Sequence, residues 1–270
     1  MPAFVRRYEE AEPQRVNRWL AQAGVCSRRE AEALIAAGRV RIDGEVVADA
    51  GRKIAPGQTL TLEPDAGDAP ADGFSQPGPF TAVLHKPVGV VSAQPERGQT
   101  PAVRLLTREA LVGSSPLIPG REVRLAPLGR LDQDSRGLLL LSTDGVLAKA
   151  VIGPQSALDK EYLVRVEGRI DAGVMARLRH GLSLDGRALK PAEVTTVAAG
   201  RLRFVLREGR NRQIRRMCEL VGLRVTDLYR TRIGPLRLLD LPERRWRVLT
   251  REERAALLAV SDPRTAPAGS

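Results

Sequence analysis

The stretch Gly129–Gly145, GRLDQDSRGLLLLSTDG, contains the clearest structural signal in the sequence. Its apolar run, Leu138–Leu141, is short and ends in polar turn residues, which predicts a strand buried on both faces rather than a helix too short to nucleate. Asp132 comes just before this strand, after Arg130 and ahead of the Ser135–Gly137 turn. The sequence therefore places a carboxylate at the edge of a rigid core element, where packed neighbours can hold a reactive group in one geometry.

The residue types alone leave other roles open for this acidic stretch. An aspartate often tightens a turn by accepting hydrogen bonds from nearby backbone amides. Asp132, Asp134 and Gly137 also fall at positions one, three and six of an EF-hand calcium loop. That loop is excluded, because Arg136 at position five offers no oxygen ligand and Thr143 stands where the bidentate glutamate belongs.

GRLDQDSRGLL resembles the signature motif of the pseudouridine synthases, most closely that of their bacterial Rsu/Rlu branch. The resemblance implies that Asp132 is the catalytic residue of an enzyme that isomerises uridine in RNA. The segment KEYLV, residues 160–164, resembles the second motif of the branch. By that match, Tyr162 stacks on the target base and is a candidate proton acceptor.

A dense group of arginines lies where a predicted strand meets a predicted helix. Its members are Arg207, Arg210, Arg212, Arg215 and Arg216. The forked guanidinium and a helix N-terminus both suit phosphate binding, so Arg210 and Arg212 are candidate substrate contacts. The surrounding EGRNRQIRRMCELVG resembles the third motif of the branch, which implies that Arg215 pairs with Asp132 and that Ile214 packs near the target base.

Two further segments carry candidate RNA contacts. KPVGVVS, residues 86–92, resembles the KPxGxxS pattern of the same branch, which implies that Lys86 and Ser92 lie beside the active cleft and contact RNA. A uridine in folded RNA must be extruded from its stack before it can react. The resemblance implies that Arg130 fills the vacated space with its planar guanidinium.

The composition favours a polyanionic partner. The 270 residues include 43 Lys and Arg against 32 Asp and Glu, a formal net charge of +11. No apolar run approaches the roughly 18–20 residues of a membrane span, and Met1–Glu10 has no signal-peptide pattern. We therefore expect a soluble cytoplasmic protein that binds RNA, not DNA or a membrane. Cys26 and Cys218 lack metal-ligand spacing and are expected to be buried free thiols.

The predicted elements indicate an α+β fold with two domains. We expect a flexible arm at residues 1–14, a helix–helix–hairpin domain at 15–62, a linker at 63–79, a catalytic domain at 80–256 and a disordered tail at 257–270. The first domain, through SRREAEALIAAGRVRIDG, resembles the S4 RNA-binding domain. That resemblance implies RNA contacts at Arg28 and Arg29, although a solvated charged face would have the same composition. The resemblance also implies a mainly antiparallel central sheet, flanked by helices and loops, in the catalytic domain.

The resemblance implies that the protein converts a specific uridine of ribosomal RNA into pseudouridine, and the motifs favour large-subunit (23S) RNA. Small-subunit (16S) rRNA and tRNA are alternative substrates, and an S4-type ribosome-assembly protein without activity is the non-enzymatic alternative. The isomerisation has no net redox change or hydrolysis, so neither a cofactor nor a metal is expected. A methyltransferase or aminoacyl-tRNA synthetase would need a nucleotide-binding signature that the sequence lacks. We expect a monomer that binds rRNA or a pre-ribosomal particle.

Overall fold

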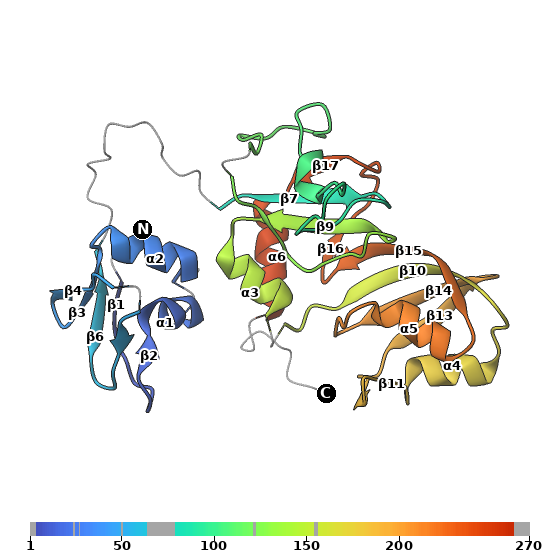
Figure 1. Ribbon diagram of the computed structural model, residues 1–270, viewed down its shortest axis with the longest axis horizontal. Coiled ribbons are helices and arrows are strands. Elements are labelled where there is room, and N and C mark those ends of the chain that lie inside the picture. The colour runs from blue at the N-terminus through green and yellow to red at the C-terminus, as the bar shows by residue number, and fades with distance from the viewer. Residues whose placement is uncertain are drawn as a thin grey trace. The chain divides into compact units, whose positions relative to one another are not determined.

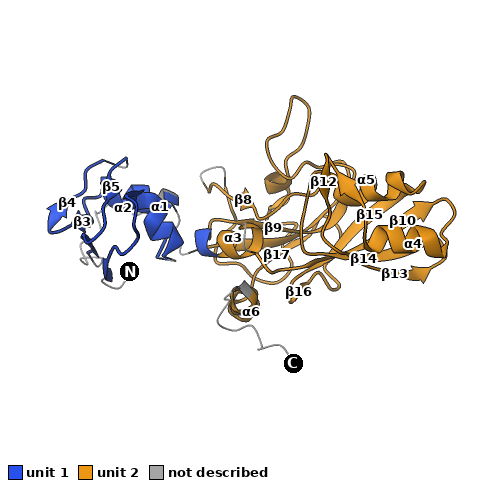
Figure 2. Cartoon of the chain, turned by 90° about the horizontal axis from the view of Figure 1, so that it is seen from below, with its two compact units in different colours: residues 1–78, 144–146 blue, residues 79–143, 147–270 orange. Residues whose placement is uncertain are grey.

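The computed structural model describes residues 4–23, 25–26, 28–49, 51–63, 79–120, 123–153 and 156–261. The chain divides into two compact units, coloured separately in Figure 2. One comprises residues 1–78 with 144–146, and the other residues 79–143 with 147–270. The predicted linker lies almost wholly outside the described residues, as does the predicted tail from residue 262 onward.

The smaller unit combines two helices with two small sheets. Its elements are β1 (Phe4–Arg7), β2 (Gln14–Arg15), α1 (Val16–Gln22), α2 (Arg28–Ala36), β3 (Val40–Ile42), β4 (Glu45–Val46), β5 (Lys53–Ile54) and β6 (Thr59–Leu62). The main sheet has the order β1-β6-β3-β4, and β2 pairs with β5. Ile42 is opposite Glu45, so Asp43 and Gly44 form a two-residue turn with φ values of 49° and 87°. The predicted helix pair and hairpin are therefore confirmed, because both turn residues have the positive φ of a type I′ turn.

The expectation of a flexible arm at residues 1–14 is wrong for its described part. Phe4–Arg7 pairs antiparallel with β6, and Tyr8 is 1% exposed. The Tyr8 ring packs edge-on against Trp19, with 5.5 Å between the ring centroids. The strand was not evident in the sequence because its partner is more than 50 residues away, and because only one of its four residues is even half-buried.

The larger unit is organised around a nine-stranded sheet (Figure 1). Its strands are β7 (Thr81–Lys86), β8 (Ala126–Pro127), β9 (Arg136–Ser142), β10 (Lys160–Glu167), β13 (Glu193–Ala198), β14 (Arg201–Leu206), β15 (Arg224–Ile233), β16 (Leu236–Arg237) and β17 (Trp246–Val248). The main order is β13-β14-β10-β15-β9-β7-β17, with β16 paired to β15 and β8 to β9. Every pair is antiparallel except β15 with β9. The predicted α+β class with a mainly antiparallel sheet is confirmed.

Helices cover this sheet in two groups, as Figure 1 shows. The helical elements are η1 (Ala102–Leu105), α3 (Gly145–Ile152), α4 (Ala172–Arg179), α5 (Gln213–Leu220) and α6 (Arg251–Ser261); β11 (Ser183–Leu184) and β12 (Arg187–Ala188) form a separate hairpin. Residues of α4 and α5 share a core with β10 and β14, whereas α3 and α6 share a core with β7 and β9. The predicted tail began too early, because Leu257 lies within α6 and is fully buried. Among the described residues, no helix is both long and apolar enough to span a bilayer.

Both cysteines are buried and free, as predicted from their spacing. Cys26 belongs to the core of the smaller unit, and Cys218 lies in α5 within the core of the larger one. Burial raises the pKa of the Cys26 thiol to about 11 and that of Cys218 to about 12. Thiolates are therefore scarce at neutral pH, and both residues act as small apolar side chains.

Strand β9 is the central buried element that the opening motif predicted. Leu138–Leu141 are 0–1% exposed. Alternate leucines enter different cores: Leu138 and Leu140 pack with Val83 on one side, while Leu139 and Leu141 belong to the cluster of Trp246 on the other. Burying each leucine contributes about 1.5–3 kcal/mol, so this strand is a rigid support for the loop that precedes it.

Gly137 is required where β9 meets its parallel neighbour. Its φ is 116°, and a Cβ added there would lie 2.3 Å from the carbonyl oxygen of Arg230 and 2.7 Å from its backbone nitrogen. Real Cβ atoms do not approach backbone this closely, so any side chain would push β15 away from β9. The glycine therefore sets the distance between the two halves of the sheet.

We expect Gly137→Ala to lower the free energy of unfolding by about 1–3 kcal/mol more than Gly181→Ala. Gly181 is the matched control because it also has a positive φ, 97°, but has no neighbouring atom within 4 Å of an added Cβ. Both variants acquire the strain of an L-residue at positive φ, whereas only Gly137→Ala adds the clash. Denaturant unfolding measures the difference; equal losses would contradict the steric role of Gly137.

Candidate active site

Asp132 lies in the loop that leads into β9, between two buried residues. Leu131 is 6% exposed and Ser135 1%. The side chain of Asp132 is 30% exposed, and its backbone carbonyl accepts a hydrogen bond from the amide of Ser135 at 3.1 Å. The backbone of this loop is thus fixed in the core while the Asp132 carboxylate remains accessible.

Ser92 fixes the residue immediately before Asp132. Its Oγ donates to the carbonyl of Leu131 at 2.7 Å and accepts from the amide of Leu131 at 2.9 Å. One hydroxyl thereby satisfies both backbone groups of a buried residue, which would otherwise cost about 1–3 kcal/mol for each unsatisfied group. Ser92 is 6% exposed, so it holds the loop from within the core; the expectation that it contacts RNA is wrong.

Lys86 fixes the other end of the loop. Its Nζ donates to the carbonyl of Ser135 at 2.7 Å and to that of Pro87 at 2.8 Å. Lys86 is fully buried, so the prediction that its ammonium contacts RNA is also wrong. Burial lowers the pKa of Lys86 to about 8, and the carboxylates of Asp132 and Asp134 partly oppose that shift. Its positive charge is therefore held inside the protein, against the backbone of the loop that contains Asp132.

The turn at Gly89 completes this clamp. The Gly89 amide donates to the carbonyl of Gln133 at 2.8 Å, and Gln133 Nε2 donates back to the Gly89 carbonyl at 3.3 Å. The KPVGVVS segment therefore holds backbone atoms on both sides of Asp132. We call these contacts of Lys86, Gly89 and Ser92 the loop clamp.

Arg212 forms the ion pair with Asp132 that the described residues contain. Its Nη1 lies 3.6 Å from Asp132 Oδ2, and its two terminal nitrogens bind the Asp134 carboxylate at 3.1 and 2.9 Å. Arg212 precedes α5 with a left-handed backbone, φ 49°, and its side chain is 44% exposed. One half-exposed arginine thus bridges both carboxylates of the DQD stretch.

Arg215 binds Asp134 and its neighbours rather than Asp132. Its Nη2 donates to the Asp134 carbonyl at 2.7 Å, and its Nε lies 3.3 Å from Asp134 Oδ2. Burial raises the pKa of Asp134, but hydrogen bonds from Arg212 and the charges of Arg215 and Arg212 outweigh it and hold the pKa below its usual range. The predicted Asp132–Arg215 pair is therefore wrong for this structure. Residues 212 and 215 lie on one side of the α5 N-terminus, so motif matching could not tell which arginine faces which carboxylate.

Comparison with known proteins identifies this arrangement. The family described as RNA pseudouridylate synthase matches residues 81–220, and the S4 domain matches residues 14–60. The chain belongs to the RNA pseudouridine synthases. These enzymes isomerise uridine in RNA to pseudouridine, and residues 81–220 contain the loop clamp, Asp132 and both arginines.

Several relatives match almost the whole chain. It is 34% identical to an uncharacterised RNA pseudouridine synthase of Aquifex aeolicus, over 90% of this chain and 93% of the relative. It is 32% identical to ribosomal large subunit pseudouridine synthase B of Bacillus subtilis, with coverage of 92% and 97%. The dual-specificity RNA pseudouridine synthase RluF of Escherichia coli K12 is 34% identical, with coverage of 88% and 76%. A crystal structure of a pseudouridylate synthase has the same fold, with a TM-score of 0.60 at 24% identity over 90% of this chain and 99% of that one.

Tyr162 and Ile214 have different surroundings in this pseudouridine synthase. Tyr162 is half-buried on β10, between Phe204 of β14 and Arg230 of β15, and packs against two core clusters, one of which contains Leu131. Ile214 is 4% exposed and belongs to the core beneath α5. Contact of either side chain with the target base stays a prediction.

Arg210 supports the fold through contacts with the β11–β12 hairpin. Its guanidinium donates to the carbonyls of Leu184, Arg187 and Ala188 at 3.2, 3.1 and 2.6 Å, which ties the β11–β12 hairpin to the start of α5. Its role in substrate binding stays a prediction, because these hydrogen bonds engage the guanidinium but leave the Arg210 side chain 27% exposed. Motif spacing cannot reveal these contacts, since the hairpin lies more than 20 residues earlier in the chain.

Arg130 and Arg28 are both exposed, so their predicted RNA contacts remain open to test. The side chain of Arg29 lies outside the described residues.

Sequence analysis missed Arg230, which is 3% exposed on β15. Its Nε donates to the Leu138 carbonyl at 2.8 Å, and its Nη1 reaches the Arg130 carbonyl at 3.4 Å. The sequence signal for Arg230 was its place at the start of RTRIGPL. Its pairing with Gly137 depends on the parallel contact between β15 and β9, which forms only in the folded protein.

We expect Ser92→Ala to lower kcat for pseudouridine formation about tenfold to a hundredfold, with little change in KM, because the loop clamp loses its hold on Leu131. Ser156→Ala is the matched control: that hydroxyl also donates to a carbonyl, of Val151 at 3.1 Å, and accepts from an amide, of Leu158 at 3.4 Å, but it lies outside the loop clamp. Single-turnover kinetics on an RNA that the wild type modifies separates the two. A similar kcat loss in both variants would refute the positioning role.

We expect the stability of the wild type to rise relative to Lys86→Met between about pH 8 and about pH 10.5. The folded-state pKa of Lys86 is about 8, below its ordinary value of 10.5, so in this window the unfolded chain binds more protons than the folded one. Stability then rises with pH, by at most about 1.4 kcal/mol per unit. Urea unfolding of both proteins at about pH 7.5 and about pH 9.5 checks the difference; the thiols titrate in both and cancel. A difference independent of pH would contradict the burial of a charged Lys86.

Proposed function

We propose that this enzyme isomerises one uridine of large-subunit ribosomal RNA, with Asp132 as the catalytic carboxylate. The observation that supports this most directly is the loop clamp. It fixes the backbone on both sides of Asp132, while the carboxylate itself is 30% exposed and has Arg212 at 3.6 Å. A nucleophile or base needs this combination of fixed position and free access.

The reaction that this carboxylate serves breaks the bond from uracil N1 to ribose C1′ and forms a bond from C5 to the same carbon. N1 gains a proton and C5 loses one, so no oxidant, reductant or water is consumed. Asp132 acts on the ribose or as a base, and in both cases it must be ionised. Arg212 places a positive charge 3.6 Å from Asp132 Oδ2.

Three other side chains complete the proposal. Tyr162 stacks on the target uracil, since it lies half-buried on a strand next to Arg230 and packs against the cluster of Leu131. Arg130 is exposed two residues before Asp132 and fills the space that the extruded uridine leaves. In the smaller unit, Arg28 is exposed at the start of α2 and contacts RNA phosphates.

The choice of substrate rests on relatives. The Bacillus subtilis protein is named for the large ribosomal subunit, and the match runs through both the S4 domain and the catalytic domain. The Escherichia coli relative is named for dual specificity, which supports testing more than one RNA. We propose that the enzyme acts as a monomer in the cytoplasm, on rRNA or on a pre-ribosomal particle.

We expect tritium release from C5-labelled large-subunit rRNA by the wild type and none by Asp132→Asn, which keeps the shape of the side chain but removes its charge. Asp185→Asn is the matched control, because Asp185 is an exposed aspartate paired with Arg216 on the β11–β12 turn. It should release tritium at the wild-type rate. RNA affinity should change less than a few-fold in both variants, since one loosely paired carboxylate contributes little to phosphate binding.

Labelled small-subunit rRNA and tRNA test the substrate class in the same assay. Release from either of these alone would overturn the choice of large-subunit RNA while keeping the reaction. Full activity of Asp132→Asn would overturn the catalytic assignment. Release from no RNA or pre-ribosomal particle, with tight binding retained, would overturn the enzymatic function.

A further inference from the structure

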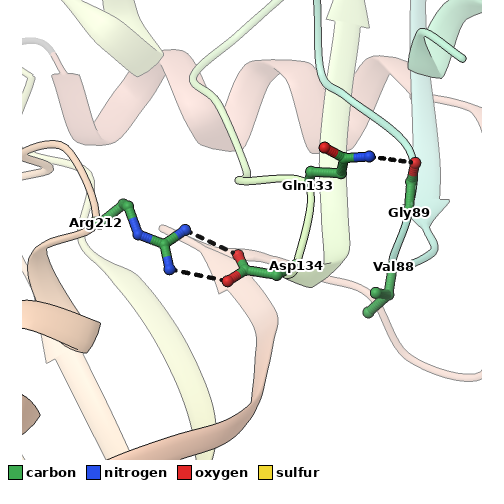
Figure 3. A pocket seen from close by; sticks show the side chains of 5 residues that line it. All are labelled: Val88, Gly89, Gln133, Asp134 and Arg212. Carbon is green, nitrogen blue, oxygen red and sulfur yellow. Dashed lines mark hydrogen bonds and ion pairs between the residues drawn. The ribbon is translucent and has the colours of Figure 1, made fainter. Parts of the chain in front are cut away.

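A pocket of about 360 Å³ lies beside the catalytic loop, lined by Val88, Gly89, Gln133, Asp134 and Arg212 (Figure 3). Ligand sites span roughly 300–1,000 Å³, so this one suits a single small ring system. Neither Asp132 nor Tyr162 is among its lining residues. The pocket therefore lies beside Asp132, whose neighbours Gln133 and Asp134 line it, and it does not include the proposed stacking residue Tyr162.

The apolar part of the pocket is Val88. Its side chain is 52% exposed, although Lys86 and Gly89 on either side are bound to the catalytic loop by hydrogen bonds. A valine held rigidly in this way offers an apolar surface that a flat ring can cover, and covering it is favourable. The turn thus presents a fixed contact surface to a ligand.

The polar part is the amide of Gln133. In Figure 3 the side chains of Gln133 and Asp134 leave the loop in opposite directions, one toward Gly89 and the other toward Arg212. The Gln133 hydrogen bond to Gly89 is long, 3.3 Å, and is easily exchanged for a better partner. A glutamine amide offers a donor and an acceptor side by side, the pair that reads the edge of a base.

The charged end is Arg212, whose side chain is 44% exposed. It binds Asp134 and lies 3.6 Å from Asp132, so it connects the pocket with the catalytic carboxylate. A guanidinium in this position suits a phosphate of the same RNA strand. Apolar surface, an amide and a cation together match the face, the edge and the phosphate of one nucleotide.

We propose that this pocket binds the base of a nucleotide adjacent to the target uridine, and that Gln133 reads its hydrogen-bonding edge. The proposal rests on the proposed function and adds a residue that determines which base the enzyme prefers beside the target uridine. Enzymes that extrude a base commonly take their context preference from contacts to the flanking nucleotides. Gln133 immediately follows Asp132, so a nucleotide bound in the pocket lies close to the reacting uridine.

The test uses short RNA hairpins that contain the uridine converted by the wild type, with each of the four bases at each flanking position. kcat/KM is measured for the wild type, Gln133→Leu, Gln133→Glu and Val88→Ala. Val197→Ala is the matched control for the valine, because Val197 is 56% exposed on β13 and does not line the pocket. All variants keep Asp132 and Arg212, and the preference is a ratio of kcat/KM values within one variant, so a loss of activity common to all hairpins leaves the preference unchanged.

We expect the wild type to prefer one base at one flanking position about tenfold, the discrimination that one well-made hydrogen-bonding contact supplies. Gln133→Leu reduces this preference to less than twofold and leaves the other flank unchanged. Gln133→Glu shifts it toward adenine or cytosine, whose exocyclic amino groups donate to a carboxylate. Val88→Ala lowers kcat/KM for all bases at that flank, and Val197→Ala behaves as the wild type.

A wild-type preference that persists in Gln133→Leu, or an equal loss on every hairpin, would overturn the reading role of Gln133. A wild type without preference at either flank would overturn the pocket assignment as well. These outcomes differ from failure of the proposed function, in which the wild type converts none of the RNAs.

Discussion

The short parallel contact between β9 and β15 is the interaction on which the active site depends. Only Tyr229 with Arg136 and Arg230 with Gly137 pair across it, yet it joins the β7–β9 half of the sheet to the half that contains β10, β14 and β15. The loop clamp and Asp132 belong to the first half, whereas α5 packs on the second. Arg212 can therefore reach Asp132 only if the two strands keep their spacing.

Side chains strengthen this junction on both sides of the backbone. Arg136 makes two hydrogen bonds to Asp227, at 3.0 and 2.9 Å, and its guanidinium lies 4.2 Å above the ring of Tyr229. Tyr229 in turn stacks on His85, at 5.4 Å between ring centroids. The Arg136–Asp227 pair is about one-third exposed, so its charge contributes modestly and its geometry matters more. Gly137 leaves room for the backbone of Arg230, and the buried Arg230 side chain binds the carbonyl of Leu138. Both residues therefore hold β9 and β15 together.

The sequence sufficed for features that depend on local pattern and failed for those that depend on tertiary contacts. The four consecutive leucines of β9 predicted a strand buried on both faces, because a short apolar run can be recognised from adjacent residues alone. The charge of Lys86 suggested contact with RNA, but its partner carbonyl belongs to Ser135, 49 residues later. Likewise, the match of Arg215 to a motif predicted a pair with Asp132, whereas its guanidinium contacts Asp134, two residues later. Motifs therefore located the site, and only the fold assigned roles within it.

The two carboxylates of the DQD stretch differ in their contacts with arginine, and this difference accounts for their different roles. Asp134 accepts two hydrogen bonds from Arg212, at 3.1 and 2.9 Å, and lies near the charge of Arg215, whereas Asp132 has Arg212 at 3.6 Å. A carboxylate tightly bound by two guanidiniums is stable but poorly reactive, since its lone pairs are occupied. Asp134 therefore orients the arginines, and the Asp132 carboxylate keeps an accessible face, with its side chain 30% exposed. Because the loop clamp and not the ion pair positions Asp132, the carboxylate can engage substrate in the proposed reaction without first breaking the contacts that hold it in place.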